Sequence, residues 1–460
     1  MTLLHLGSWC HLDGRNGGND LAIPARHLVT HGVIVGMTGS GKTGLSTVLA
    51  EEALRAGIPV IAIDVKGDLP NLLLSFPDFD PSRFEPWAEA TDPSVGTLEA
   101  AVRLAEERRA ALSKWSIGEE DLCQYRNTTA VRVLTPGATT GEPLHVLSTL
   151  ERRSPRWDTD PESARFVLSG AVSLVLRLLG RDPDPARSRE HVLLSVLAER
   201  RMLRGQNAEL SALMEDLADP PIDEIGALPI DSFFKKAERR ALAAALNTLI
   251  ASPTFSSWRQ GVSLDVAEWL GGGTGRTNAV VVSVAHLDDE DRALVLGLLL
   301  EEILCWVRGL GGSRHLRALV IFDEVFGFLP PHPANPPTKR PLVALMKQAR
   351  AFGVGVVVAT QNPMDLDYRV LSNAGLWCLG RLQTDADRAR VIDGLAAGDR
   401  AAAADLARTL PRLAPRWFVV RNAHVRAGSL LMHPRETLSL MRGPMTRDEI
   451  QRARAVRGVD

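Results

Sequence analysis

Residues 36–43 have the types and the spacing that are needed to hold a chain of phosphates. The stretch "GMTGSGKT" fits the pattern G-x-x-x-x-G-K-[ST] in full, and it lies between an apolar run and a helical pattern. Its glycines let backbone N–H groups turn inward around a phosphate, and the start of a helix adds partial positive charge. The lysine would reach the β and γ oxygens, and the last hydroxyl would bind Mg²⁺. The sequence therefore predicts an ATP site formed by Gly36, Thr38, Gly39, Ser40, Gly41, Lys42 and Thr43.

A second stretch, "LVIFDEV" at residues 319–325, supplies two adjacent carboxylates. Four apolar residues would carry Asp323 to the carboxyl end of a buried strand, where it can hold the Mg²⁺ shell together with Thr43. Glu324 is then placed to polarise an attacking water as a general base. An acidic pair at the end of a strand is common, so this pair gains its meaning from the phosphate loop. Adjacent Asp and Glu favour repeated hydrolysis over a nucleotide switch, which needs only the Asp.

Two further strand ends carry polar residues. Gln361 closes the apolar run in "VVVATQNP" at residues 356–363, and its amide can sense a γ-phosphate or orient the attacking water. Asp64, Lys66 and Asp68 close the run in "IDVKGDL", near the expected nucleotide. A supporting role is open for these three, although a surface salt-bridge cluster is the commoner outcome for such residues.

The elements that must position these residues form an α/β pattern. Short apolar runs, typical of buried parallel strands, alternate with helical patterns. We expect an ATPase core at residues 31–84 and 278–425, with a mainly parallel β-sheet flanked by helices. Residues 85–277 carry helical periodicity with many Arg and Glu, which predicts a large, mostly helical insertion. Residues 1–30 are expected to form a short strand and turn segment, and residues 426–460 a helical tail.

Composition limits the class of protein. The 460 residues carry a net charge of −2, so no overall basic footprint for nucleic acid is present, although a local basic channel stays open. The four cysteines are far apart in the sequence, which favours reduced thiols over disulfides or zinc. The longest uncharged apolar runs, 166–176 and 293–300, are too short for a membrane span. We expect a cytoplasmic protein without a membrane contact.

The order of these motifs resembles the HerA/FtsK superfamily of hexameric DNA-pumping ATPases, and most closely the bacterial HerA-like ATP-binding proteins. The resemblance rests on "GMTGSGKT", "IDVKGD", "IFDE", "ATQNP" and "LSNAGLWCLGRLQTDADRARVI". It covers residues of about 25 to 445 and is most specific at 33–70 and 317–392. It implies a RecA-like P-loop core, a homo-oligomeric ring with ATP and Mg²⁺ at subunit interfaces, and translocation along double-stranded DNA.

The resemblance also implies roles for single residues. Glu324 matches the catalytic carboxylate of the family, and Gln361 matches its strand-terminal glutamine. The family uses an arginine from the neighbouring subunit, which can contribute about 10³ to 10⁵ in rate. Arg381 and Arg350 compete for this role, and we favour Arg381. For each of them, a surface arginine paired with a nearby acid is the alternative.

Two features depart from the family pattern. About 30 residues precede the phosphate strand, too few for the N-terminal β-barrel that helps to lock the ring of HerA itself. The frequent Gln-Arg-Pro of the family is Gln361-Asn362-Pro363 here. Both departures concern ring assembly and the DNA partner more than ATP hydrolysis. The chain ends in an Arg-rich helical pattern, so it is either a short member or a fragment.

The favoured function is therefore an ATP-hydrolysing, ring-forming motor that acts on double-stranded DNA. One alternative is an ATPase that moves or assembles protein, as in the secretion and conjugation branches of the superfamily. Another is a regulatory NTPase that serves a partner nuclease. A small-molecule kinase is the weakest option, because the Asp-Glu and Thr-Gln strand ends favour hydrolysis.

Overall fold

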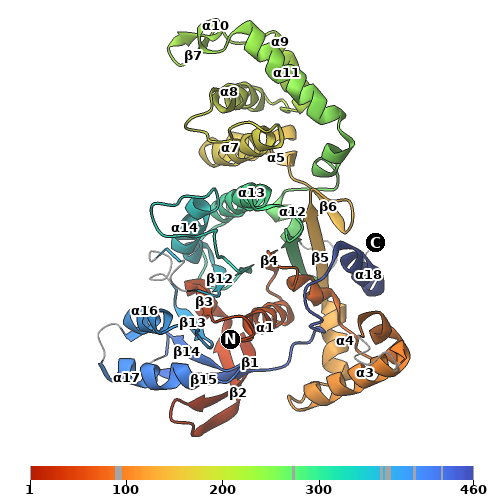
Figure 1. Cartoon of the computed structure of the whole chain (residues 1–460), viewed down its shortest axis with the longest axis vertical. Helices are drawn as coiled ribbons and strands as arrows, with labels where there is room; N and C mark the ends of the chain where they lie inside the picture. The colour runs from red at the N-terminus through yellow and green to blue at the C-terminus, as the bar shows by residue number, and fades with distance from the viewer. Residues whose placement is uncertain are drawn as a thin grey trace.

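One large mixed sheet forms the centre of the molecule. The computed structural model describes residues 2–88, 96–271, 275–362, 366–367, 374–396, 400–425 and 428–458. In these residues the sheet has thirteen strands in the order β2-β1-β15-β14-β13-β3-β12-β11-β4-β10-β5-β6-β9 (Figure 1). Neighbouring strands from β13 to β9 are parallel, and those from β2 to β13 are antiparallel. The predicted α/β class with a mainly parallel sheet and flanking helices is confirmed.

The strands of the sheet have the following bounds: β1 Leu3–His11, β2 Asn16–Pro24, β3 Gly32–Val35, β4 Val60–Asp64, β5 Thr129–Pro136, β6 Glu142–His145, β9 Val262–Ser263, β10 Thr277–Ser283, β11 Ala318–Asp323, β12 Val354–Thr360, β13 Leu376–Leu379, β14 Phe418–Asn422 and β15 Ser429–Pro434. A separate hairpin pairs β7 Glu224–Ile225 with β8 Leu228–Pro229.

The central strands are buried on both faces. Every residue of β3, β4, β11 and β12 is buried. Alternate side chains enter two different hydrophobic cores: Val320 and Phe322 of β11 enter one, and Leu319 and Ile321 enter the other. This arrangement explains why these strands are continuous apolar runs instead of alternating patterns.

Helices cover both faces of the sheet. α1 (Lys42–Arg55), α3 (Thr97–Ser113), α4 (Glu119–Thr128) and α18 (Arg447–Arg457) pack into the core on one face. α13 (Asp289–Arg308), α14 (Lys339–Gln348), α16 (Asp385–Ala396) and α17 (Arg400–Thr409) belong to the core on the other. The short helices are α2 (Pro81–Phe84), α5 (Ser148–Glu151), α6 (Arg156–Thr159), α10 (Ile230–Phe233) and α12 (Val266–Leu270).

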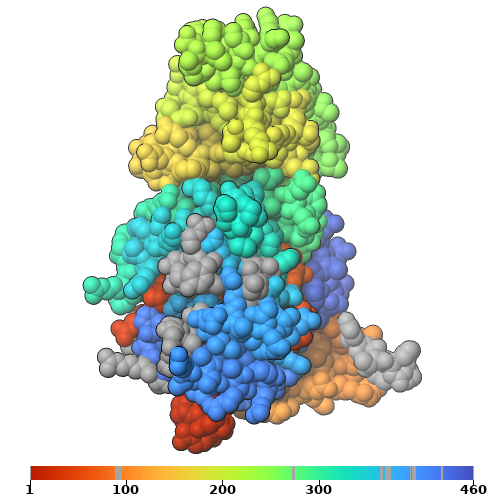
Figure 2. All heavy atoms as spheres, turned by 60° about the vertical axis from the view of Figure 1, so that its left-hand side comes forward, coloured from red at the N-terminus to blue at the C-terminus, as the bar shows by residue number. Residues whose placement is uncertain are grey.

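A helical layer lies beyond α13. It consists of α7 (Pro161–Leu178), α8 (Arg189–Leu203), α9 (Leu210–Ala218) and α11 (Lys236–Ala251), and α7 packs directly on α13. Figure 1 shows these helices stacked at one end of the long axis, and Figure 2 shows them as the yellow and green upper part of the molecule. No helix in the described part of the chain is both long and apolar enough to cross a membrane.

Two of the expected segments also supply strands. Residues 85–277, predicted to be mostly helical, contain β5, β6 and β9, which extend the main sheet beyond β10. The expected helical tail, 426–460, contains β15 as well as α18, and β15 pairs with β1 and β14. Both ends of the chain therefore build the antiparallel part of the sheet. The division into four segments stays a prediction.

Candidate nucleotide site

The loop between β3 and α1 has the conformation that a phosphate chain requires. Gly39 and Gly41 have φ angles of +77° and +95°, in the region where glycine is favoured. A Cβ atom on Gly41 would lie only 3.2 Å from the Cγ of Arg416, so the position is crowded as well as left-handed. Helix α1 begins at Lys42, directly after this turn. The free N–H groups of its first turn therefore follow the glycines.

Lys42 is held over the loop. Its side chain is buried, and Nζ donates to the carbonyl oxygens of Gly36 at 2.5 Å and of Met37 at 3.2 Å. Burial lowers the pKa of Lys42, whereas the nearby carboxylates of Glu324 and Asp323 act in the opposite direction. The ammonium thus lies between the loop and the acidic pair.

Thr43 and Asp323 meet although 280 positions separate them in the sequence. The hydroxyl Oγ1 of Thr43 donates to Oδ2 of Asp323 at 3.1 Å. Asp323 ends β11 and is almost completely buried. Burial and the nearby carboxylates of Asp64, Asp68 and Glu324 raise its pKa to about 7. A cation bound beside Asp323 would therefore stabilise the ionised form of this carboxyl group.

Asp64 faces Asp323 across two neighbouring strand ends. The two residues are register partners in the parallel pair β4 and β11. Asp64 accepts hydrogen bonds from the N–H groups of Gly67 and Asp68, and the hydroxyl of Ser283 donates to its Oδ2 at 2.7 Å. Complete burial still raises its pKa to about 6. Asp64 shapes the turn that follows β4.

Glu324 is fixed by its backbone and by two partners. Its φ angle is +66°, an uncommon value for a residue other than glycine. The Nζ atom of Lys66 lies 2.7 Å from Oε2. The backbone N–H of Gln361 donates to Oε1 at 3.3 Å. Such local strain occurs at functional sites when the surroundings hold it in place.

Gln361 and the phosphate loop are directly linked. Thr38 Oγ1 donates to Oε1 of the glutamine at 2.9 Å, so β12 ends beside the loop. Ser40 lies beneath the loop, where a Cβ atom on Gly36 would come within 2.5 Å of its hydroxyl. The last residue of the "ATQNP" stretch, Pro363, lies outside the described residues.

The two candidate arginines lie at opposite ends of the parallel strands. Arg381 follows β13, and its carbonyl oxygen accepts a hydrogen bond from Met37 N at 2.8 Å, beside the phosphate loop of its own chain. Arg350 precedes β12, in the short 3-10 helix η5 (Ala349–Phe352), whereas Gln361 follows the same strand. β12 has seven residues, so roughly 20 Å separate its two ends. Both arginines are exposed.

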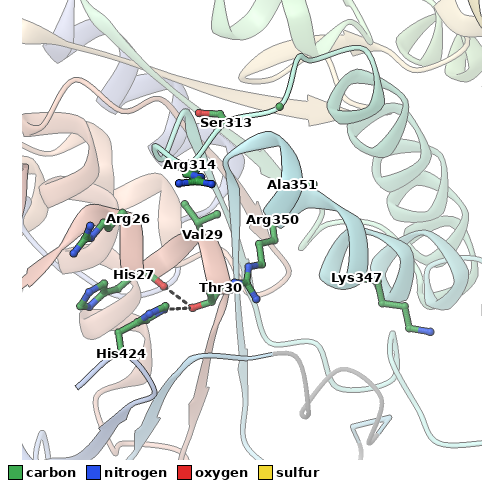
Figure 3. Close-up of a pocket in the computed structure, with 11 residues that line it drawn as sticks. Arg26, His27, Val29, Thr30, Ser313, Arg314, Lys347, Arg350, Ala351 and His424 are labelled. Atoms are coloured by element: carbon green, nitrogen blue, oxygen red, sulfur yellow. Dashed lines mark hydrogen bonds between the residues drawn. The ribbon is translucent and has the colours of Figure 1, made fainter. Parts of the chain in front are cut away.

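Arg350 lines a basic pocket at the start of the strands. The described lining residues include Arg26, Arg314, Lys347 and Arg350, and none of the described ones is acidic. Figure 3 shows three of these arginines around the hollow, with His424 and Thr30 joined by a hydrogen bond. Burial, the stacked neighbour His424 and the charge of Arg26 together lower the pKa of His27 to about 4. The pocket therefore suits an anion.

The region that carries the phosphate loop matches the model of a known family. Residues 11–75, which include β3, the phosphate loop, α1 and β4, match the family model described as Helicase HerA-like C-terminal. Over these residues, the chain is similar to that family. The resemblance seen in the sequence is thereby confirmed over these residues, and the predicted ATPase is supported at the level of that family. No curated protein matches the chain.

Solved structures align with nearly the whole of this chain. VirB4 of Thermoanaerobacter pseudethanolicus has a TM-score of 0.52 at 12% identity, over 94% of this chain and 96% of that one. This likeness concerns the fold, and it confirms the predicted RecA-like P-loop core. The bacterial conjugative coupling protein TrwBdeltaN70 follows with a TM-score of 0.47 at 12% identity, over 96% and 91% of the two chains. TrwB in complex with ADP and Mg²⁺ gives a TM-score of 0.43 at 12% identity, over 92% and 89%.

The side chains at the end of β11 and the start of α1 fit Mg²⁺. Magnesium prefers hard oxygen ligands and is usually bound through one or two carboxylates together with phosphate oxygens and water. Thr43 and Asp323 offer a hydroxyl and a carboxylate within hydrogen-bond distance of each other. The described residues contain no group of three or more His, Cys, Asp or Glu that could hold a metal by themselves.

The end of β4 and the turn that follows it contribute more to the site than the sequence alone indicated. Asp64 and Lys66 contact the site directly, through the register with Asp323 and through the ion pair with Glu324. The available signal was that two apolar runs, "VIAID" and "VIFD", both end in aspartate, as parallel neighbours with a shared edge would. The sequence does not reveal that the two strands are adjacent.

Proposed function

We propose that this protein is an ATP-hydrolysing, ring-forming motor that translocates on double-stranded DNA. The observation that carries the proposal is the contact between Thr43 and Asp323 at 3.1 Å, beside the buried ammonium of Lys42. It joins the loop that would hold the phosphates to the carboxylate that would hold their metal. Four free cysteines are consistent with action in the cytoplasm.

Each residue has a distinct part in the proposed reaction. The loop 36–43 holds the triphosphate of ATP, with Lys42 on the β and γ oxygens. Thr43 and Asp323 hold Mg²⁺, which supplies charge neutralisation on the phosphates. Glu324 takes a proton from the attacking water, and Gln361 orients that water or senses the γ-phosphate. The direct hydrogen bond between Thr38 and Gln361 supports this role, because it links the sensor to the loop.

We propose Arg350, in preference to Arg381, as the arginine that serves the neighbouring subunit. A residue that acts in trans must lie away from the site of its own chain. The backbone of Arg381 contacts its own loop through Met37, whereas Arg350 lies at the opposite end of the strands. The surrounding basic pocket would then face the nucleotide of the neighbour, which supports a head-to-tail ring. A hexamer is the ring size that we propose.

The test is the turnover of ATP with and without duplex DNA, read beside the native mass in solution. A DNA motor should be an oligomer whose turnover rises with DNA and loses that stimulation as salt increases, because phosphate contacts release counterions. A monomer that hydrolyses ATP and ignores DNA at low salt would contradict the motor, while the nucleotide site would stand.

A motor that moves or assembles protein is the second candidate. The observation in its favour is the net charge of −2, since no overall basic excess attracts a nucleic acid. An oligomer whose turnover is indifferent to DNA at every salt concentration would favour this candidate. A regulatory NTPase with a partner nuclease would instead keep its output when Glu324 is replaced by Gln.

A further inference from the structure

Lys66 makes a contact that the proposed reaction does not use. Its ammonium lies 2.7 Å from Oε2 of Glu324, the proposed base, while the other carboxylate oxygen accepts from Gln361 N. Both oxygens of the base are thus engaged by protein groups, one of them by a full positive charge. A carboxylate that is bound to an ammonium is a poorer acceptor for a proton of water, because the proton and the cation compete for the same lone pairs.

The two partners differ in their freedom to move. The side chain of Lys66 is 39% exposed, whereas that of Glu324 is 9% exposed. A flexible four-carbon stem carries the ammonium. The backbone beneath it is fixed, because Asp64 accepts from the N–H groups of Gly67 and Asp68, and Met445 N donates to the carbonyl oxygen of Gly67 at 2.9 Å. The lysine is therefore the partner with more freedom to move.

The contact of Lys66 with Glu324 lies beside the phosphate loop. Glu324 accepts from Gln361 N, and Gln361 in turn accepts from the hydroxyl of Thr38 in that loop. The positive charge of Lys66 is one of the causes that lower the pKa of Lys42, behind burial and against the opposing effect of Glu324. The two ammonium groups therefore repel each other across the same site. An anion with several strong acceptor oxygens at this point would attract both of them. The terminal phosphate is the part of ATP on which Glu324 would act.

We propose that Lys66 is a positioning residue that restrains Glu324 and gives up this contact in favour of the terminal phosphate of a bound triphosphate. The inference rests on the proposed function, and it adds a control to that site. Lys66 would keep the base engaged beside a diphosphate, which has no such phosphate. Hydrolysis would then be permitted only when its substrate is in place.

A double-mutant cycle on nucleotide binding tests this restraint without measuring turnover. The four proteins are the wild type, Glu324→Gln, Lys66→Met and the double variant, and the dissociation constants of Mg-ADP and of a non-hydrolysable Mg-ATP analogue are compared. Glu324→Gln frees the lysine, so the analogue should bind about threefold to fivefold more tightly, as expected for a partly exposed ion pair, while ADP binding stays unchanged. In the Lys66→Met background the gain should disappear.

Two controls separate the restraint from other effects. Lys66→Arg keeps the positive charge, so the gain from Glu324→Gln should survive in that background. Lys114→Met removes an exposed lysine at the end of α3, and it should bind both nucleotides as the wild type does. Because Lys66 is exposed, its variants should fold.

The possible outcomes distinguish this inference from the proposed function. A gain that persists in the Lys66→Met background would come from the lost glutamate charge alone, and it would overturn the restraint. An analogue affinity that Glu324→Gln leaves unchanged would overturn it as well. A wild-type protein that binds neither nucleotide would instead contradict the ATP site itself.

Discussion

Carboxylates are concentrated near the ends of β4 and β11. Burial and the charges of Asp64, Asp68 and Glu324 raise the pKa of Asp323 to about 7. Two ammonium groups, on Lys42 and Lys66, lie among them. Opposite charges held this close in a buried place are costly for stability, and they are typical of sites that bind a charged ligand.

The buried side chain of His31 should make the free energy of unfolding depend on pH. His31 precedes the phosphate strand, and its Nδ1 accepts a hydrogen bond from Val356 N at 3.1 Å. Burial and the charge of Arg350 lower its pKa from 6.5 to about 4. Because the folded protein resists protonation, the stability that the neutral ring supplies is complete above pH 6.5 and is lost as the pH falls toward 4. This shift of the pKa corresponds to about 3 kcal/mol in the free energy of unfolding.

The measurement compares urea unfolding of the wild type and of His31→Gln between pH 7 and pH 4. The variant has no ring to protonate, so its free energy of unfolding should fall less steeply with decreasing pH than that of the wild type. All other titrating groups are shared and cancel in the comparison. Parallel curves for the two proteins would show that His31 is not held neutral.

The phosphate helix is anchored to the far end of the chain. Arg435, directly after β15, forms ion pairs with Glu51 and Glu52 of α1, each at 2.9 Å. All three side chains are buried, and Glu51 also accepts from the N–H groups of Leu438 and Ser439. The segment that follows reaches Asn71 and Gly67, beside the turn that carries Lys66. The segment after β15 thus holds both the phosphate helix α1 and the turn after β4 in place.

Replacement of Arg435 should therefore lower the free energy of unfolding. Arg435→Met leaves two buried carboxylates without their cation, and breaking such a buried pair typically costs about 3–5 kcal/mol. Thermal or urea unfolding measures the loss. Arg408→Met, which removes an exposed arginine paired with Asp405, is the matched control and should stay within about 0.5 kcal/mol of the wild type. Equal stability of the two variants would contradict the anchoring role.

The elements show what the sequence could and could not predict. The strands β3, β4, β10, β11, β12, β13 and β14 all follow from apolar runs, because burial on both faces requires such runs. β5, β6 and β9 were hidden among helical patterns, since they are short or carry polar residues such as Arg132. β15 was missed for a similar reason, because only part of its length is buried.

The same limit applies to the site. The phosphate loop is local in sequence, so its pattern predicts its own geometry. The contact of Lys66 with Glu324 joins residues 258 positions apart, and it depends on the order of strands in the sheet. The choice between Arg381 and Arg350 stays a prediction, because spacing along the chain does not show which end of a strand faces a neighbouring subunit.

At the scale of the whole molecule, the residues of the proposed reaction lie at the two opposite ends of the strands of one sheet. The phosphate loop, Asp323 and Glu324 follow the strands, whereas Arg350 and its basic pocket precede them. A single chain cannot bring these ends together through a rigid sheet. A ring of identical subunits can, since each interface would join the loop of one copy to the pocket of the next.

Mixing two inactive variants tests this arrangement. Lys42→Ala should abolish nucleotide binding, and Arg350→Ala should lower turnover by about 10³ or more. When the two are mixed and allowed to exchange subunits, some interfaces combine the intact loop of one with the intact arginine of the other. Turnover should then reappear. A mixture as inactive as its components would contradict action in trans, and Arg381→Ala in place of Arg350→Ala serves as the comparison.

The central claim is that the loop at residues 36–43 and the acidic pair at 323–324 form one site that hydrolyses ATP. The most direct measurement compares the wild type with Glu324→Gln in both ATP binding and ATP turnover in the presence of Mg²⁺. We predict that the variant binds ATP at least as tightly as the wild type, while its turnover falls by about 10² to 10⁴, the usual contribution of a general base. Turnover by the variant within a few-fold of the wild type would contradict the account.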